Sequence, residues 1–209
     1  MKQQLDNPFK AEEIYVALSQ MSPTMASRPD GLLVAFYQKY WHSVKNEVIK
    51  ICLHILNDRG FIALLNHTYI TMIFKVARPL KVTGFISISF CNVIYKIVAK
   101  SIANRLKNIH HVICPTQSAF IPNRLISDNT IIRYECLHKI RHSKKIKHGL
   151  VVLKLDVNKA YDRVEYSFLE HIILRMRFSC RWVELIMNCV ATVSFSVIVN
   201  GIAKWLFYP

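Results

Sequence analysis

The stretch from Val151 to Val164, VVLKLDVNKAYDRV, contains the side chain best suited to chemistry in this sequence, the carboxylate of Asp156. Its first six residues alternate in the period of two that is typical of a strand, and this strand would end at Asp156. A carboxylate at the end of a buried strand offers hard oxygen ligands to a divalent cation from a rigid support. A surface aspartate that closes a strand fits the same pattern, and the residue types alone leave both interpretations open.

The elements around this strand are predicted from apolar spacing and capping residues. Helical spacing indicates helices near residues 10–20, 35–41, 43–56, 92–109, 127–140, 164–172 and 179–189, with Ser43 and Asn92 as caps of the third and fourth. In the last of these helices the residues expected to face inward are Trp182, Leu185, Ile186 and Cys189. β-branched runs indicate strands at 69–76, 85–90 and 194–199. Asn200-Gly201 is a strong hairpin signal and predicts a returning strand from Ala203 to Tyr208.

The two helices that flank the Asp156 strand in sequence are each expected to bury one face. Ser127 or Asp128 would cap the first of these helices, with the inward residues Ile132, Cys136 and Ile140. In the second helix the apolar residues recur at Val164, Phe168 and Ile172. Similar spacing in the helix that begins near Ser43 predicts the inward residues Val44, Val48, Ile51, Cys52 and Ile55.

The chain is strongly basic, with a formal net charge of +15, and the excess is concentrated in its middle. Residues 71–150 carry 14 basic and 2 acidic residues, whereas the regions on either side are nearly balanced. A local basic excess suits a polyanion, most simply nucleic acid. Within this region Lys96, Lys100 and Lys107 share one helical side, which fits a phosphate-binding face and a solvated lysine face equally well.

The six cysteines show no C-x-x-C spacing and no ligand pattern with the nine histidines. Because most of them lie among apolar residues, we expect buried free thiols in a reducing intracellular compartment, nucleus or cytoplasm. The first ten residues lack the apolar core of a signal peptide. The uncharged run from Leu185 to Ala203 is long enough to cross a bilayer, but its polar residues favour a helix followed by a strand, so no membrane contact is expected.

The segment LKLDVNKAYDRVEYSFL resembles the first catalytic motif of reverse transcriptases, in the form used by plant LINE-type (non-LTR) retrotransposons. The resemblance covers nearly the whole chain. The segments NPFKAEEIYVAL, SRPDG and FYQKYW are similar to the start of the fingers of these polymerases. The segments LNHTYITMIFKV, FCNVIYKIVAKSIANRLK and PTQSAFIPNRLISDNTIIRYECLHKIRH then follow in the order and spacing of that family.

The resemblance implies RNA-templated DNA synthesis by two-metal phosphoryl transfer. It identifies Asp156 as a catalytic residue and Mg²⁺ ligand that acts with partners from a later Asp-Asp hairpin. It places Tyr161 at the position of the aromatic residue that blocks a ribose 2′ hydroxyl, although a packed aromatic explains Tyr161 as well. It places Lys75 at the position of a basic fingers residue near the nucleotide triphosphate.

The sequence departs from the family pattern at several positions. Ile86 replaces the arginine expected at the triphosphate, which removes a charge-assisted contact of about 1.5–3 kcal/mol and makes deoxynucleotide binding doubtful. Gly84 replaces an acid, and Asn123 replaces a glycine, which is milder because Asn tolerates a left-handed backbone. No Tyr/Phe-x-Asp-Asp occurs in residues 1–209. The chain is therefore expected to be a truncated and inactive piece of the enzyme.

Together these observations predict an α+β fold that is mostly helical with a small antiparallel sheet. It would consist of right-hand polymerase fingers at residues 1–149 and an incomplete palm at residues 150–209. The expected partners are an RNA template and a DNA primer, with Mg²⁺ held only weakly by this fragment. A non-catalytic basic nucleic-acid-binding protein is the alternative function. Without flanking strands, residues 151–156 would form an unpaired apolar edge.

Overall fold

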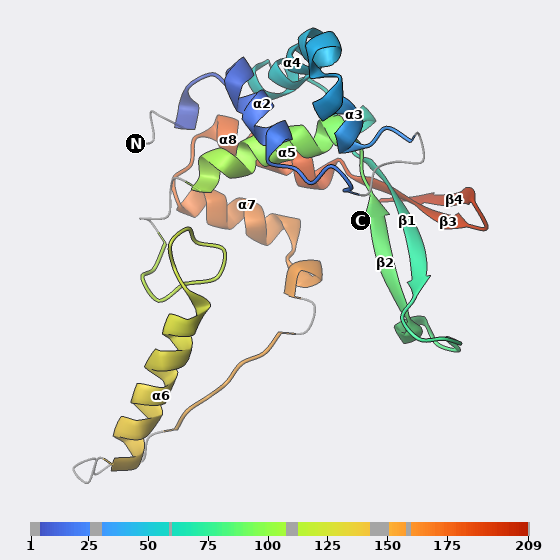
Figure 1. The fold of residues 1–209 in the computed structure, drawn as a ribbon. Helices are drawn as coiled ribbons and strands as arrows, with labels where there is room; N and C mark the ends of the chain where they lie inside the picture. Colours follow the sequence, from blue (N-terminus) through green and yellow to red (C-terminus); the bar gives the residue numbers. More distant parts are fainter. Residues whose placement is uncertain are drawn as a thin grey trace. The chain divides into compact units, whose positions relative to one another are not determined.

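The computed structural model describes residues 5–25, 31–58, 60–107, 113–142, 151–157 and 160–208. These residues belong to two compact units (Figure 1). The first unit combines the chain up to Asn104 with the segment from Glu165 onward, and the second runs from Arg105 to Val164. Helices and strands both occur, which confirms the predicted α+β class.

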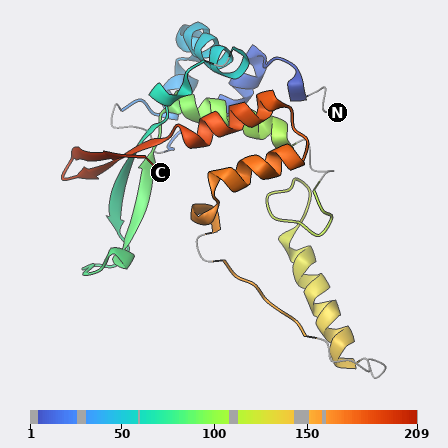
Figure 2. The ribbon, with the colours of Figure 1, turned by 180° about the vertical axis from the view of Figure 1, so that it is seen from behind.

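The first unit holds most of the helices. They are α2 (Ala11–Ser19), α3 (Val34–Lys39), α4 (Trp41–Asn57), α5 (Val93–Leu106, whose last two residues are counted with the second unit), α7 (Tyr166–Arg175) and α8 (Cys180–Ala191), together with the short 3-10 helix η1 (Ile62–Leu64). The views from front and back both place α5 in the middle of this group (Figures 1 and 2).

Local signals in the sequence explain several helix starts. The Glu13 carboxylate accepts a 2.9 Å hydrogen bond from the Lys10 backbone N–H and closes the first turn of α2. The Asn92 side chain accepts a 2.7 Å bond from the Ile94 N–H, which confirms Asn92 as the predicted cap of α5. The prediction of a cap at Ser43 is wrong, because α4 begins two residues earlier at Trp41.

The core of the first unit forms where α5 packs against its neighbours. Ile97 and Val98 are fully buried on α5, and the Tyr95 hydroxyl donates to the Cys189 carbonyl of α8 at 3.1 Å. Of the four residues of α8 predicted to face inward, Trp182 and Cys189 are buried, whereas Leu185 and Ile186 are half-buried. Val48, Cys52 and Ile55 on α4 are buried as predicted. Ile51 was also expected to face inward, but it is exposed because its side of α4 carries no covering element among the described residues.

Four strands form one sheet in the order β2-β1-β3-β4. They are β1 (His67–Phe74), β2 (Phe85–Phe90), β3 (Ser194–Val199) and β4 (Ile202–Phe207). The β1–β2 and β3–β4 pairs are antiparallel, but β1 and β3 are parallel, so the prediction of an antiparallel sheet is correct for only two of the three pairs. A parallel pair requires a long crossover, which the segment containing α5, α7 and α8 provides.

The hairpin from β3 to β4 has the turn that its sequence predicts. Asn200 and Gly201 both have positive φ, at 52° and 79°, as a two-residue turn between twisted strands requires. The uncharged run from Leu185 onward is therefore the end of α8 followed by β3, as expected. No helix within the described ranges has the length and apolar composition needed to span a bilayer.

One buried polar residue joins distant parts of the first unit. The Asn66 amide Nδ2 donates to the Cys189 carbonyl at 2.8 Å and to the Thr192 hydroxyl at 3.0 Å. The Asn66 carbonyl accepts a 3.2 Å bond from the Ser194 N–H. Asn66 is 2% exposed, so it fixes the start of β1 against the end of α8 through bonds that water does not replace.

The second unit consists of a loop at residues 113–125, helix α6 (Ile126–His142), the segment 151–157 and the short 3-10 helix η4 (Ala160–Arg163). Helix α6 buries none of its side chains. The prediction that Ile132, Cys136 and Ile140 face a core is therefore wrong: Ile132 is 51% exposed, Cys136 is exposed and Ile140 is half-buried. Polar residues surround α6 on all sides, which leaves no continuous apolar face to bury.

The face predicted for the helix after Asp156 is also wrong. Helix α7 begins at Tyr166, so Val164 precedes it, and Phe168 and Ile172 are exposed. The buried residue is Ile173, one position further along the helix. Among the described elements α7 packs mainly against α8, which agrees with the burial of Ile173 rather than of Phe168 or Ile172.

Candidate functional site

Asp156 lies on an extended segment of the second unit. The prediction of a strand at residues 151–156 is wrong, because residues 151–157 take no regular secondary structure. The apolar side chains of this segment are open to solvent, with Val151 90%, Leu153 75% and Leu155 79% exposed. A strand requires a neighbour for its ladder hydrogen bonds, and no described segment pairs with this one. Figure 1 draws it as an orange coil that leads toward η4.

The Asp156 carboxylate is exposed, so its oxygens are accessible to a cation. No group of three or more His, Cys, Asp or Glu side chains suited to a metal ion occurs in the described part of the chain. Two adjacent cations require several shared carboxylate oxygens. The donor set around Asp156 therefore does not fit a two-metal centre.

Tyr161 belongs to the same unit as Asp156. Its backbone lies in η4, five residues after Asp156, while its side chain falls outside the described residues. Asn158 and Lys159, which connect the two positions, also lie outside the described residues. The expected role of Tyr161 against a ribose 2′ hydroxyl therefore remains a prediction.

Lys75 belongs to the first unit and follows directly after β1. The three predicted site residues thus belong to two units, Lys75 to the first and Asp156 and Tyr161 to the second. The Lys75 N–H donates to the Gly84 carbonyl at 2.8 Å, and the Gly84 N–H donates to the Lys81 carbonyl at 2.9 Å. These bonds close the loop at residues 75–84, which connects β1 with β2.

Close packing in this loop explains why position 84 is a glycine. A Cβ atom at this position would lie 2.7 Å from the Cβ of Pro79, closer than side chains approach one another. The acid that the family pattern leads one to expect here would therefore collide with Pro79. Its absence also leaves the loop without a negative charge.

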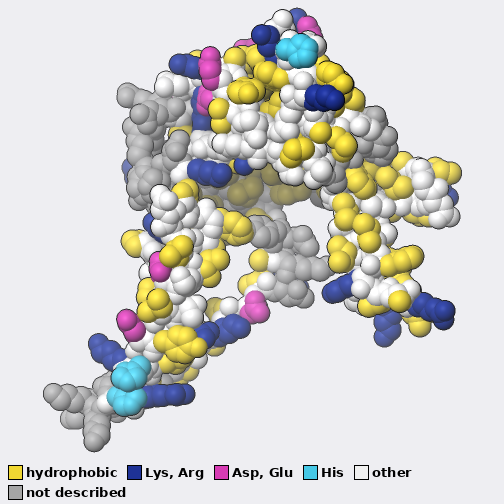
Figure 3. Space-filling view, viewed as in Figure 1, with side chains coloured by type: hydrophobic (Ala, Val, Ile, Leu, Met, Phe, Trp, Pro, Cys, Tyr) yellow, Lys and Arg dark blue, Asp and Glu magenta, His cyan; other side chains and the backbone are white. Residues whose placement is uncertain are grey.

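The β1–β2 loop carries three exposed cations, Lys75, Arg78 and Lys81, which we call the hairpin cations. The space-filling view shows blue side chains gathered at the free end of this hairpin (Figure 3). Of these three, the family resemblance predicts a role for Lys75 alone. The signal for the other two was a pair of basic residues, without an acid, between the strands predicted at 69–76 and 85–90.

The predicted lysine side at residues 96, 100 and 107 is not a uniform solvated face. Lys96 and Lys100 are half-buried on α5, while Lys107 is exposed and belongs to the second unit. Burial lowers the pKa of the Lys96 ammonium. The densest basic stretch of the sequence, from Arg141 to Gly149, lies outside the described residues from position 143 onward.

The loop before α6 is held in shape by Arg124. Its guanidinium donates to the carbonyls of Cys114 at 2.7 Å and Gln117 at 2.5 Å. Asn123 has a left-handed backbone with φ 63°, so an asparagine does take the conformation expected where the family has glycine. Residues 113–125 hold this shape without any buried apolar side chain.

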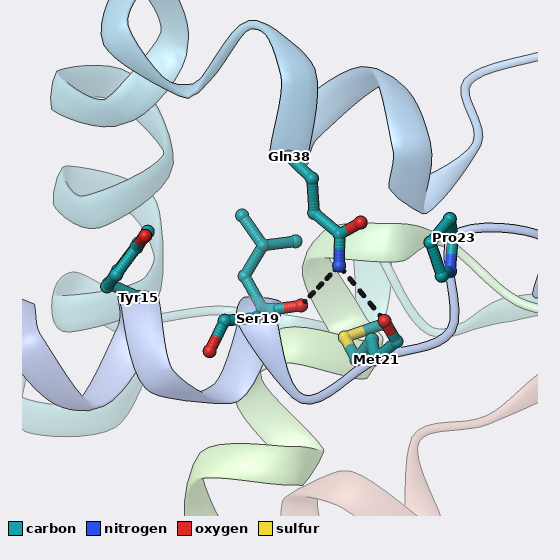
Figure 4. Close-up of a pocket in the computed structure, with 6 residues that line it drawn as sticks. Tyr15, Ser19, Met21, Pro23 and Gln38 are labelled. Carbon is teal, nitrogen blue, oxygen red and sulfur yellow. Dashed lines mark hydrogen bonds between the residues drawn. The ribbon is translucent and has the colours of Figure 1, made fainter.

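A shallow pocket of about 280 Å³ lies between α2 and α3 in the first unit (Figure 4). It is lined by Tyr15, Leu18, Ser19, Met21, Pro23 and Gln38. The Gln38 amide crosses it and donates to the carbonyls of Leu18 and Met21, both at 2.9 Å. The polar groups of this pocket hold the turn after α2 in place, and none of its side chains is charged. The pocket is therefore a structural contact between α2 and α3 and not a candidate ligand site.

Two comparisons with known proteins bear on the site. Residues 82–208 match the family model described as "Reverse transcriptase (RNA-dependent DNA polymerase)", and this match includes Asp156 and Tyr161. The "Transposon TX1 uncharacterized 149 kDa protein" of Xenopus laevis is 26% identical over 200 residues, which are 95% of this chain. The chain spans 15% of the length of that relative.

Proposed function

Because the chain belongs to the reverse transcriptase family, we propose that residues 1–209 are a segment of an RNA-directed DNA polymerase of a LINE-type non-LTR retrotransposon. The observation that carries this proposal is the family match across residues 82–208, with Asp156 inside it. The similarity to a transposon protein supports the mobile-element origin. Affiliation with the plant form rests on the motif around Asp156 alone.

In this proposal residues 1–149 supply the fingers and residues 150–209 the first part of the palm. Asp156 contributes one carboxylate to the metal centre of the polymerase, and its open position leaves room for further ligands. Tyr161 faces the sugar of the incoming deoxynucleotide, and Lys75 faces its phosphates. Mg²⁺ would polarise the phosphoryl oxygens and activate the attacking hydroxyl in the assembled enzyme.

We further propose that residues 1–209 do not catalyse DNA synthesis by themselves. The sequence contains no second acidic motif of the Tyr/Phe-x-Asp-Asp type, and one carboxylate does not hold two cations. Among the described residues, no strand lies beside the segment that carries Asp156 to fix its carboxylate. Both features oppose the sub-ångström positioning that phosphoryl transfer requires.

A primer-extension assay tests this proposal. The 209-residue protein is incubated with a primed RNA template, deoxynucleotides and Mg²⁺ or Mn²⁺, beside the Asp156→Asn variant. We expect no extension product from either protein. Extension by the unaltered protein that Asp156→Asn abolishes would show that the 209 residues hold a working centre and would contradict the claim of inactivity.

The second candidate function, non-catalytic binding of nucleic acid, is favoured by the hairpin cations. Three exposed positive charges on one ten-residue loop without an acid suit a phosphate backbone. Each phosphate contact made by a cation adds about 0.9 to the slope of log affinity against log salt for duplex DNA. The contribution of this loop to binding can therefore be measured from the slope of log affinity against log salt concentration, the salt slope.

The matching experiment compares two triple variants with equal charge loss. Changing Lys75, Arg78 and Lys81 to Gln should lower the salt slope for a primer–template duplex by about 2–3. The control changes Lys10, Lys45 and Lys50, exposed lysines on or just before α2 and α4, and should lower it by less than about 1. Equal effects would refute a role of this loop, and no binding at low salt would exclude the second candidate function.

A further inference from the structure

The end of the β1–β2 hairpin extends beyond the rest of the sheet. β1 pairs with β3 only as far as Thr71, whereas its pairing with β2 continues to Phe74, which lies opposite Phe85. From Met72 onward the two strands therefore form a two-stranded ribbon (Figure 1). Successive side chains of a strand point to opposite faces, and Met72, Ile73 and Phe74 are all exposed, so both faces of this ribbon are open to solvent.

The loop that closes the ribbon holds one apolar side chain out in solvent. Leu80 is 98% exposed, more than any other large apolar side chain of the described residues. Its neighbour Pro79 is half-buried and lies against Gly84. The ring of a proline fixes its φ, and the hydrogen bonds that join Gly84 to Lys75 and to Lys81 close the loop. The loop is thus constrained while the Leu80 side chain projects from it.

Positive charges flank this leucine. Arg78 and Lys81 lie two residues before and one residue after Leu80, and all three hairpin cations are exposed. Figure 3 shows hydrophobic side chains among the basic ones at the free end of the hairpin. A nucleic acid complements this arrangement, because its phosphates contact cations and its base pairs offer an apolar stacking surface. One leucine offers far less apolar contact than an acyl chain, which by itself gives only marginal membrane binding.

The size of the apolar contact indicates where Leu80 can insert in a nucleic acid. Burying one leucine side chain is worth about tenfold to a hundredfold in affinity. Separating two stacked base pairs of an intact duplex costs about the same factor, so insertion there gains little. The cost is smaller where a terminal base pair adjoins unpaired bases, because no pairing is broken. The gain from Leu80 is therefore largest at the end of a duplex.

We propose that Leu80 is an apolar wedge that packs on the terminal base pair at a junction between duplex and single-stranded nucleic acid. Arg78 and Lys81 contact phosphates beside that pair, and Leu80 displaces the first unpaired base from the stack. This proposal rests on nucleic-acid binding by the hairpin cations, the second candidate function. It specifies the structure that they bind, which is a junction rather than a uniform duplex.

Two nucleic acids that differ only in a junction test the proposal. One is a duplex with both ends closed by polyethylene glycol linkers, and the other has one end open with a single-stranded template extension. We expect the 209-residue protein to bind the second at least about tenfold more tightly, and Leu80→Ala to reduce this preference to about twofold or less. The matched control Leu64→Ala, which shortens a 77% exposed leucine of η1, should leave both affinities unchanged.

A fluorescent base analogue shows whether Leu80 reaches the stack. 2-Aminopurine at the first unpaired template position fluoresces more strongly when it is unstacked. Its fluorescence should rise severalfold at saturation with the unaltered protein and with Leu64→Ala, but not with Leu80→Ala. Because Leu80 and Leu64 are exposed, circular dichroism should show the same fold in all three proteins.

The outcomes separate this proposal from the function on which it rests. Equal affinity for the junction and the closed duplex, or a junction preference that Leu80→Ala leaves intact, would overturn the wedge alone. No binding to either nucleic acid at low salt would refute nucleic-acid binding itself and the wedge with it. Leu80-dependent binding to vesicles of phosphatidylcholine and phosphatidylserine, without a junction preference, would assign the loop to a lipid surface and overturn the proposal.

Discussion

The two units of this protein differ most in what they bury. Every buried apolar side chain in the described ranges lies in the first unit, from Phe9 on the N-terminal side to Cys189 on α8. In the second unit the only described side chain in the buried class is that of Ser118, at 7% exposure. Yet the second unit carries Asp156 and Tyr161, the residues that the family resemblance links to chemistry.

Strand β3 of the first unit and the segment 151–157 of the second illustrate this contrast. In the first unit β3 pairs with β1 and β4, and its apolar residues are half-buried. The segment 151–157 has a comparable apolar pattern but has no strand beside it among the described residues. An apolar pattern thus becomes a strand only where a partner satisfies its backbone. Asp156 would be fixed in place only after its segment gains such neighbours.

The largest expected difference is in core substitutions. Ile97→Ala on α5 removes a fully buried side chain and should lower the free energy of unfolding by about 2–5 kcal/mol. Ile132→Ala on α6, where the side chain is 51% exposed, should change it by less than about 0.5 kcal/mol. Urea titration followed by circular dichroism measures both. Similar losses in the two variants would mean that α6 also belongs to a packed core.

The next largest difference is expected between two side-chain amides, one in each unit, in what they contribute to the free energy of unfolding. Asn66→Ala removes two hydrogen bonds from a buried site and should cost about 1–3 kcal/mol. Asn129→Ala in the second unit removes one bond, from its Nδ2 to the Ser118 hydroxyl at 2.7 Å, and should cost less than about 1 kcal/mol because Asn129 is exposed. The same urea titrations compare them, and a reversed order would contradict the contrast between the units.

Buried thiols should make the first unit sensitive to alkaline pH. Burial raises the pKa of Cys52 and of Cys189 from 9.0 to about 12. Below pH 9 both thiols are neutral in the folded and unfolded states, so their burial costs no ionisation energy. Between pH 9 and 12 only the unfolded state ionises, so stability falls as the pH rises, by about 1.4 kcal/mol per thiol at pH 10.

Thermal unfolding at pH 8 and pH 10 measures this effect. The variants Cys52→Ala and Cys189→Ala should each reduce the loss between the two pH values by about 1.4 kcal/mol. Cys136→Ala on α6 is the control, since that thiol is exposed, and should leave the loss unchanged. A loss that none of the three substitutions reduces would show that other groups ionise instead.

The smallest effect is expected at Asp156 itself. Asp156→Asn changes an exposed side chain on a segment without secondary structure, so the free energy of unfolding should change by less than about 0.5 kcal/mol. The urea titration that serves for Ile97→Ala detects any larger change. A loss above 1 kcal/mol would indicate that the carboxylate has structural partners in solution, against its exposed position in the structure.

The sequence was most informative where a structural signal is local. The Asn92 cap, the Asn200-Gly201 turn and strand β2 depend on neighbouring residues and were predicted correctly. The buried face of α6 and the strand ending at Asp156 depend on distant partners, and both predictions were wrong. The parallel pairing of β1 with β3 was missed for the same reason, because it joins residues more than 120 positions apart.

The candidate site was predictable only in part. Asp156 was identified by its resemblance to a family motif, and the family match over residues 82–208 includes it. The catalytic roles of Asp156, Tyr161 and Lys75 remain predictions, as does the division into fingers and palm at residue 150. The expectation that most cysteines are buried was wrong, because only Cys52 and Cys189 are buried while Cys114, Cys136 and Cys180 are exposed. Whether a cysteine flanked by apolar residues is buried depends on tertiary packing, which its neighbours in sequence do not determine.

Amide hydrogen exchange read peptide by peptide tests the contrast between the units most directly. The amides of α5 and α8 should exchange slower than unstructured chain by roughly a thousandfold or more, since they open only with the packed core. The amides of residues 151–157 should exchange within about tenfold of unstructured chain. Protection of residues 151–157 equal to that of α5 would show that the Asp156 segment is already paired and rigid, which would contradict the account.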